Sequence, residues 1–123
     1  MSKRRKVVGI IEDDSSMSKS LARVLSAHGF ATEIYSSAEA YIREAAGSKA
    51  TCLVIDIQLG GMTGIELRQR LANSGSQLSV VFMSAVADAA VESSALAAGC
   101  LAFLHKPFKA RQLIDVIKGA PSS

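Results

Sequence analysis

The chain alternates short apolar runs with longer amphipathic segments. The apolar runs occupy residues 6–11, 31–35, 52–55, 78–83 and 101–104. The third and fourth runs are almost continuously apolar, which is typical of parallel strands that are covered on both faces of a sheet. The run at 31–35 alternates apolar and polar residues, so we expect it near a sheet edge.

Apolar residues between these runs recur with a helical period of about 3.6 residues. These segments lie around residues 17–28, 38–45, 63–73, 88–98 and 110–117. Strict alternation of five strands with five helices predicts a single doubly wound α/β domain with a parallel sheet. Right-handed crossovers would place helices on both faces of that sheet.

Two of the predicted helices have distinctive sequences. The fourth, at 88–98, is rich in alanine, and Val91 and Leu96 are its only larger apolar residues, so we expect it to pack shallowly. The second is preceded by Ser36, with Glu39 three residues later. This spacing is the capping-box pattern, which predicts that Ser36 caps the second helix.

Composition supports one globular domain. The 123 residues are 49% hydrophobic and 20% charged, unlike a disordered chain. Apolar stretches fall well short of the roughly 20 residues that span a membrane, and the N-terminus does not resemble a signal peptide. Cys52 and Cys100 have no CxxC partner, which argues against a zinc site. We therefore expect a cytoplasmic protein with reduced thiols and no membrane contact.

The formal net charge of +3 is concentrated at the N-terminus, where residues 3–6 are all basic. Without those four, ten basic residues remain against eleven acidic ones. We predict a basic tail at 1–5, a domain at 6–119, and a C-terminal tail or linker start at 120–123. The tail is either solvated or makes a weak contact with nucleic acid or an acidic partner, and the domain itself should not bind nucleic acid directly.

Polar residues follow four of the predicted strands. They are Glu12, Asp13 and Asp14, then Asp56, Ser84 and Lys106. The carboxyl ends of parallel strands lie along one sheet edge, where ligands of open α/β folds bind. Crowded carboxylates raise one another's pKa, and a hard cation such as Mg²⁺ would relieve their repulsion. Asp56 is then a candidate nucleophile toward a phosphoryl group, with Lys106 stabilising the transferred charge.

Each of these residues also has a plainer interpretation. Acidic residues before a helix often cap its amide groups, and Asp56 is compatible with a simple turn. Ser84 could be another helix cap and Lys106 a surface charge. These separate interpretations do not explain why all of these residue types stand at strand ends.

Four motifs, IIEDD, LVIDIQLGGMTGIEL, VVFMSA and LHKPF, occur in this order along the chain. Together they resemble the receiver domain of two-component response regulators across residues 6–119. The resemblance implies a flavodoxin-like (βα)5 fold with sheet order 2-1-3-4-5. The chain is most similar in character to receivers that precede helix-turn-helix output domains.

The resemblance also assigns roles at the acidic cluster. Glu12 and Asp13 correspond to the acidic pair, and Asp13 to its direct metal ligand. Asp56 corresponds to the phosphoacceptor, which shares Mg²⁺ with the backbone carbonyl of Gln58. Lys106 corresponds to the lysine that assists phosphoryl transfer.

Further roles concern the switch. Ser84 corresponds to the switch hydroxyl, Phe103 to the switching aromatic residue, and the Lys106–Pro107 bond to a cis peptide. The chain departs from the family at Gly60, where a proline is usual; followed by Gly61, this should loosen the loop.

These roles imply a phosphorylation switch and not a multiple-turnover enzyme. The expected donor is a sensor histidine kinase or a phosphotransfer protein. The expected output face is the fourth helix with the fifth strand, which would meet an output domain or a second copy. A phosphatase of the haloacid-dehalogenase type would need an acid where Gln58 stands, and a flavodoxin-like phosphate loop would be repelled by Glu12, Asp13 and Asp14. A degenerate receiver that serves only as an interaction module is disfavoured because the acids, Ser84 and Lys106 are all present.

Overall fold

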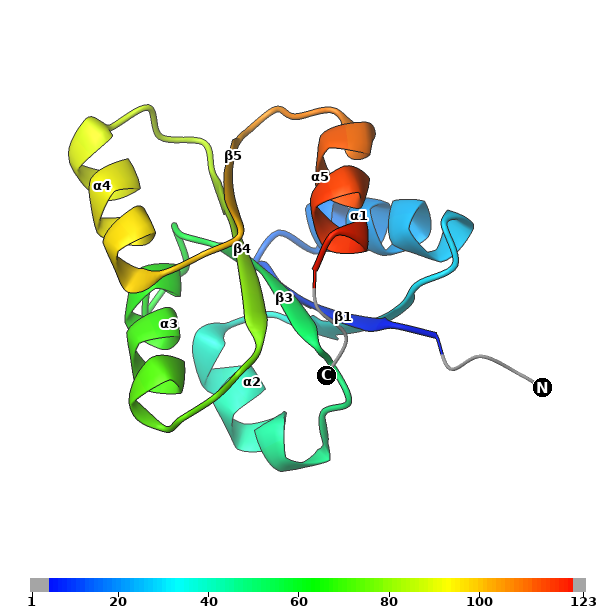
Figure 1. Ribbon diagram of the computed structural model, residues 1–123, viewed down its shortest axis with the longest axis horizontal. Helices are drawn as coiled ribbons and strands as arrows, with labels where there is room; N and C mark the ends of the chain where they lie inside the picture. Colours follow the sequence, from blue (N-terminus) through cyan, green and yellow to red (C-terminus); the bar gives the residue numbers. More distant parts are fainter. Residues whose placement is uncertain (1–4, 121–123) are drawn as a thin grey trace.

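The computed structural model describes residues 5–120, and its centre is a parallel sheet in the order β2-β1-β3-β4-β5 (Figure 1). The strands are β1 (Val7–Ile11), β2 (Ala31–Tyr35), β3 (Cys52–Asp56), β4 (Ser79–Ser84) and β5 (Ala102–His105). Both the parallel sheet and the predicted strand order are confirmed.

Helices cover both faces of the sheet. They are α1 (Ser15–Ala27), α2 (Ala38–Glu44) with the short 3-10 turn η1 (Ala45–Gly47), α3 (Gly64–Asn73), α4 (Ala89–Ala98) and α5 (Ala110–Lys118). Figure 1 shows α1 and α5 on one face and α2, α3 and α4 on the other. Within residues 5–120, none of these helices has the length and apolar character needed to cross a membrane.

The burial of the strands explains their sequence patterns. All of β3 is buried, since it lies in the middle of the sheet with helices over both faces. Val54 faces the core under α1 and α5, whereas Leu53 and Ile55 face the core under α2, α3 and α4. By contrast, β2 is an edge strand, as its alternating sequence predicted, and Ile34 is exposed there.

The predicted capping box of the second helix is wrong. Ser37, not Ser36, is the N-cap of α2, and its hydroxyl accepts a hydrogen bond from the Ala40 amide at 3.0 Å. The helix begins one residue later than the pattern suggested, so Glu39 is its second residue and not its third. The Glu39 carboxylate instead accepts a hydrogen bond from the amide of Met62, in the loop after β3.

Two residues at the ends of the described chain belong to the packed body. Lys6, the first residue of the predicted domain, donates hydrogen bonds from its ammonium to the carbonyls of Ile117 at 3.1 Å and Ala120 at 2.8 Å. Ala120, assigned to a C-terminal tail, is itself buried. A cation at this position satisfies carbonyls at the C-terminus of α5 and interacts favourably with the helix dipole.

We expect Lys6→Ala to lower the free energy of unfolding by about 1–2 kcal/mol, since it removes charge-assisted hydrogen bonds to a helix C-terminus. Arg5→Ala, at an exposed position one residue away, should change it by less than about 0.5 kcal/mol. Urea denaturation of the three proteins measures both values. Equal effects of the two substitutions would show that the Lys6 contacts contribute nothing.

Candidate functional site

Three carboxylates meet at the carboxyl edge of the sheet. Glu12, Asp13 and Asp56 each place an oxygen so that the three atoms lie within 4.8 Å of one another. The sheet register causes this, because β1 and β3 are neighbours and Ile11 is paired with Ile55. Glu12 and Asp56 are only 2% and 5% exposed, whereas Asp13 is open to solvent. The structure therefore brings together three of the predicted metal ligands.

Lys106 connects two of these carboxylates. Its Nζ donates to Glu12 Oε1 at 2.7 Å and to Asp56 Oδ2 at 2.9 Å. The lysine follows β5, and its backbone N–H donates to the carbonyl of Ser84 at 2.8 Å, which fixes it beside the end of β4. The Lys106–Pro107 bond is cis, as the resemblance implied. The predicted meeting of acids and lysine is thus confirmed.

Burial changes the ionisation of this cluster. Desolvation is the main reason that the pKa of Glu12 is raised from 4.5 to about 7, and a hydrogen bond with Asp56 raises it further while Lys106 opposes the shift. Burial alone would lower the pKa of Lys106, but its hydrogen bonds with Glu12 and Asp56 raise it above its ordinary value. Lys106 therefore stays charged at neutral pH, while Glu12 exchanges a proton near pH 7.

Asp14, the third acid of the EDD motif, caps a helix and does not join the acidic cluster. Its Oδ1 accepts hydrogen bonds from the amides of Ser16 at 2.9 Å and Met17 at 3.2 Å, so it is the N-cap of α1. The three consecutive acids thus divide into one helix cap and two members of the acidic cluster. The residue pattern alone allows either role for each of the three, and the resemblance assigns only Glu12 and Asp13 to the acidic pair.

The carboxylate of Asp56 is held in a defined orientation. Its Oδ1 accepts a hydrogen bond from the backbone amide of Gln58 at 2.9 Å, while Oδ2 accepts from Lys106 Nζ. The following residue, Ile57, continues the sheet pairing by donating to the carbonyl of Met83 at 2.9 Å. Gly64 begins α3 directly against this strand end, where an added Cβ would lie 2.6 Å from the Asp56 carbonyl oxygen. The N-terminus of α3 therefore packs directly against the backbone of Asp56 and restrains the residue that carries the carboxylate.

Ser84 is directed toward Gln58. Its hydroxyl is buried at the end of β4 and donates to Gln58 Oε1 at 3.0 Å, and the Ala85 amide donates to the same oxygen at 3.3 Å. The sequence predicted a role for the backbone carbonyl of Gln58 and excluded its side chain as a general acid, but it did not predict this side-chain contact. An amide two residues after Asp56 was visible in the sequence, but its partner depends on how the loop after β3 lies beside β4.

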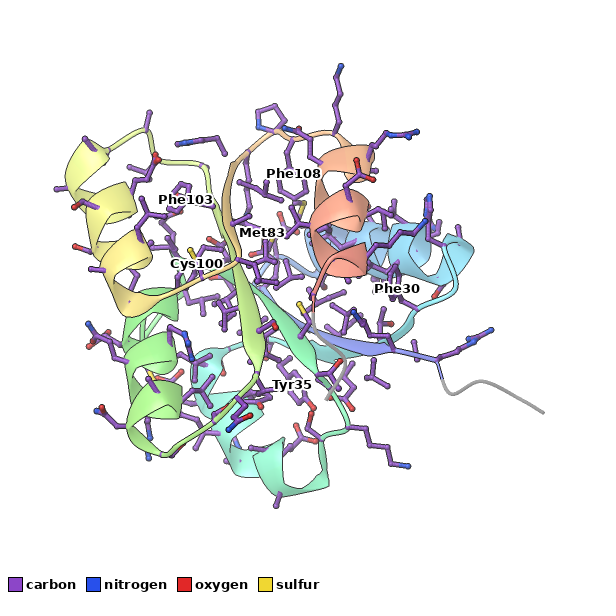
Figure 2. All side chains as sticks on the ribbon, viewed as in Figure 1. Phe30, Tyr35, Met83, Cys100, Phe103 and Phe108 are labelled. Carbon is purple, nitrogen blue, oxygen red and sulfur yellow. The ribbon has the colours of Figure 1, made fainter. Side chains whose placement is uncertain are left out.

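Phe103 and His105 connect β5 with α4. Phe103 is half-buried, and Figure 2 shows it on the α4 side of the sheet, opposite Phe108. The ring centroids of Phe103 and His105 are 5.0 Å apart, and His105 Nε2 lies 3.0 Å from Glu92 Oε1 on α4. Within α4 (Ala89–Ala98) only Ala95 is buried, which confirms the shallow packing predicted for this helix.

Fold and site together define the class of this protein: a flavodoxin-like α/β domain with an acidic cluster at the sheet edge where its strand order reverses. A family model described as response regulator receiver domain matches residues 8–118. The chain belongs to this family of two-component signalling domains.

Two curated relatives show the extent of the similarity. Response regulator protein TodT of Pseudomonas putida is 29% identical over 120 residues, which cover 98% of this chain and 53% of TodT. Transcriptional regulatory protein FixJ of Rhizobium meliloti is 31% identical over 113 residues, which cover 92% of this chain and 55% of FixJ. The chain thus spans about half the length of these relatives.

Solved structures agree with the fold. The crystal structure of FixJ-N has a TM-score of 0.87 at 27% identity and covers 98% of this chain and 100% of its own. A response regulator receiver protein from Pseudomonas putida has a TM-score of 0.91 at 19% identity, covering 97% of this chain and 100% of its own. The second likeness concerns the fold alone.

The carboxyl of Glu12 should titrate with a midpoint near pH 7 in metal-free protein, and Lys106→Met should raise the midpoint further because it removes the charge that opposes the shift. Carboxyl carbon NMR measures both. Because folding raises the pKa of Glu12, its protonated carboxyl stabilises the folded state fully below pH 4.5, and this stabilisation is lost as the pH rises through 7. Glu12→Gln should therefore make the free energy of unfolding less dependent on pH between these values. A parent midpoint near 4.5 would contradict the prediction.

Gln58→Met keeps the length of the side chain but removes the oxygen that accepts from Ser84 and Ala85. We expect hydrogen exchange at the Ala85 amide to become up to about tenfold faster, which corresponds to one lost hydrogen bond. Gln69→Met, at an exposed position on α3, serves as the matched control. Equal exchange rates at Ala85 in the parent and Gln58→Met would show that this contact does not protect the β4 end.

Proposed function

We propose that this chain is a phosphorylation switch that accepts a phosphoryl group on Asp56. The donor is the phosphohistidine of a sensor histidine kinase or phosphotransfer protein, as membership of the receiver family suggests. The supporting observation is a nearly buried carboxylate that Lys106 and the Gln58 amide hold in place within the acidic cluster. An Asp56 oxygen attacks phosphorus, the P–N bond breaks, and its electron pair leaves with the imidazole, which is then protonated.

The acidic cluster fits Mg²⁺. Its three carboxylates offer hard oxygen ligands within 4.8 Å of one another, and one of them is exposed, which leaves an open side. Glu12, Asp13, Asp56 and the Gln58 carbonyl are the residues that would hold the ion. Bound there, Mg²⁺ would neutralise the carboxylates and stabilise charge on the phosphoryl oxygens. Lys106, already hydrogen-bonded to Asp56, provides a second positive charge beside the reacting oxygen.

Ser84 is the residue we propose to carry the signal. In the present state its hydroxyl has two acceptors within reach, Gln58 Oε1 at 3.0 Å and the Val86 carbonyl at 3.3 Å. A phosphoryl group on Asp56 adds negative charge and strong acceptor oxygens, which compete for the hydroxyl proton. Movement of Ser84 would leave room for Phe103 to turn inward from its half-buried position. The shallow packing of α4 makes this helix the element that such a change biases most easily.

The face formed by α4 and β5 is the proposed output surface. Three large apolar side chains on or beside α4 are strongly exposed, namely Val86, Leu96 and Leu101. An output domain or a second copy of the chain would cover them. Because several relatives are named transcriptional regulatory proteins, we propose a DNA-binding output domain as the partner, with no direct nucleic acid contact by this domain.

This function is that of a cytoplasmic signalling domain and not of a metabolic enzyme. A phosphatase that uses an aspartate nucleophile needs a nearby general acid, and the position two residues after Asp56 is Gln58. The side-chain amide of Gln58 cannot act as a general acid, and its Oε1 already accepts hydrogen bonds from Ser84 and Ala85.

Intact mass spectrometry after incubation with acetyl phosphate and Mg²⁺ tests the proposal. We expect the parent to gain one phosphoryl group and Asp56→Asn to gain none, since an amide is not a nucleophile. Asp88→Asn, which alters the exposed N-cap of α4, is the matched control and should be labelled like the parent.

No gain in the parent, or an equal gain in Asp56→Asn, would overturn the assignment. Amide NMR spectra of the labelled protein should change across residues 84–108. Unchanged spectra there would overturn the proposed switch even if Asp56 is labelled.

A further inference from the structure

The loop between β3 and α3 contains an unusual contact with the start of α2. The Met62 amide donates a hydrogen bond to Glu39 Oε2 at 2.9 Å. Gly61, one residue earlier, has φ of +76°, and a Cβ added there would lie 2.6 Å from the same oxygen. The Glu39 carboxylate is therefore seated directly on this loop, against a residue whose lack of a side chain makes room for it.

The two ends of the loop are held by other means. Near β3, the side chains of Ile57 and Leu59 are buried. Near α3, Thr63 and Glu66 form a reciprocal capping box. Between these anchors, Gly60 and Gly61 offer no side chain to fix the backbone. Within residues 5–120, Glu39 supplies the side-chain hydrogen bond to this middle part of the loop.

We propose that Glu39 is a positioning residue that holds the β3–α3 loop in the arrangement that presents Gln58 to the phosphoacceptor site. The inference rests on the proposed function, because Gln58 is assigned there as a ligand of Mg²⁺ through its carbonyl. The link is short: Gln58 bonds to Asp56 through its amide and to Ser84 through its side chain, and only Leu59 separates it from the glycine pair.

A carboxylate suits this role at this place. Glu39 lies in the first turn of α2, where the helix dipole favours negative charge. The hydrogen bond from the Met62 amide is the main reason that the pKa of Glu39 is lowered, and the positive charge of Arg43 lowers it slightly further. The group is therefore ionised at neutral pH and makes a charge-assisted hydrogen bond to the loop. The contact restrains a part of the loop that Gly60 and Gly61 leave without side chains.

Loss of this contact should redistribute the loop among several conformations. The fraction of molecules with Gln58 in the binding-competent position then falls, and the apparent affinity for Mg²⁺ falls by the same factor. One hydrogen bond corresponds to about a two- to tenfold change in an equilibrium constant. A purely structural role at the helix N-terminus would change stability and leave Mg²⁺ affinity as it was.

Titration calorimetry of Mg²⁺ into metal-free protein tests the proposal with three variants. Glu39→Ala should bind Mg²⁺ about two- to tenfold more weakly than the parent. Glu39→Gln should restore most of the affinity, because its amide oxygen can still accept from Met62. Glu44→Ala removes the same charge from an exposed position on α2 and should bind like the parent. Parent-like affinity in Glu39→Ala, or equal losses in Glu39→Ala and Glu39→Gln, would overturn the proposal.

Hydrogen exchange at the Met62 amide gives a readout that does not depend on metal. It should be about two- to tenfold faster in Glu39→Ala than in the parent and Glu44→Ala, and unchanged exchange would also overturn the proposal. A parent that binds no Mg²⁺ and takes no phosphoryl group would instead overturn the proposed function. In that case faster exchange at Met62 would retain Glu39 as a loop contact without a role in presenting Gln58.

Discussion

The hydrogen bonds from Lys106 to Glu12 and Asp56 are the interaction on which the site depends. Two carboxylates that are almost fully buried would repel each other and resist ionisation without a nearby cation. The lysine supplies that cation from the far side of β4, so β1, β3 and β5 are connected through their side chains as well as through the sheet. The raised pKa of Glu12 shows that the compensation is incomplete. Lys106 is paired with only two of the three carboxylates, and a divalent cation would replace the proton that Glu12 otherwise takes up.

The same corner of the molecule combines rigid and adjustable parts. Asp56 is fixed by the sheet, by the Gln58 amide and by the close approach of Gly64. The Ser84 hydroxyl is instead held by loop residues: it donates to Gln58 Oε1 at 3.0 Å or to the Val86 carbonyl at 3.3 Å, and it accepts from the Val86 amide at 3.1 Å. In the proposed function, a phosphoryl group on Asp56 would therefore leave the Asp56 backbone in place and act on the Ser84 hydroxyl. The loop that carries Gln58 contacts both groups, so in this proposal it would connect phosphorylation of Asp56 with movement of Ser84 at the end of β4.

The two faces of the domain differ in how firmly their helices are attached. α5 buries Leu113, Ile114 and Ile117, and Lys6 donates hydrogen bonds to the Ile117 carbonyl in its last turn and to the Ala120 carbonyl just after it. α4 buries only Ala95 within its length and is also connected to β5 by the exposed contact between Glu92 and His105. Low local stability is expected where few apolar contacts are made. The proposed change at Ser84 would therefore shift α4 more easily than the elements that pack against α5.

Much of this arrangement follows from the sequence alone. Continuous apolar runs that end in Glu12, Asp56 and Ser84 determine a parallel sheet with polar groups along one edge, because parallel strands end on the same side. Local patterns were less reliable where one residue of register matters, as at Ser36 and Ser37. The tertiary structure alone decided the partners of Lys6, Glu39 and the Gln58 side chain. It also decided that Asp14 caps a helix while Glu12 and Asp13 join the acidic cluster. Each of these contacts joins segments far apart in the chain or depends on which way a side chain turns, and periodicity and spacing carry no information about either.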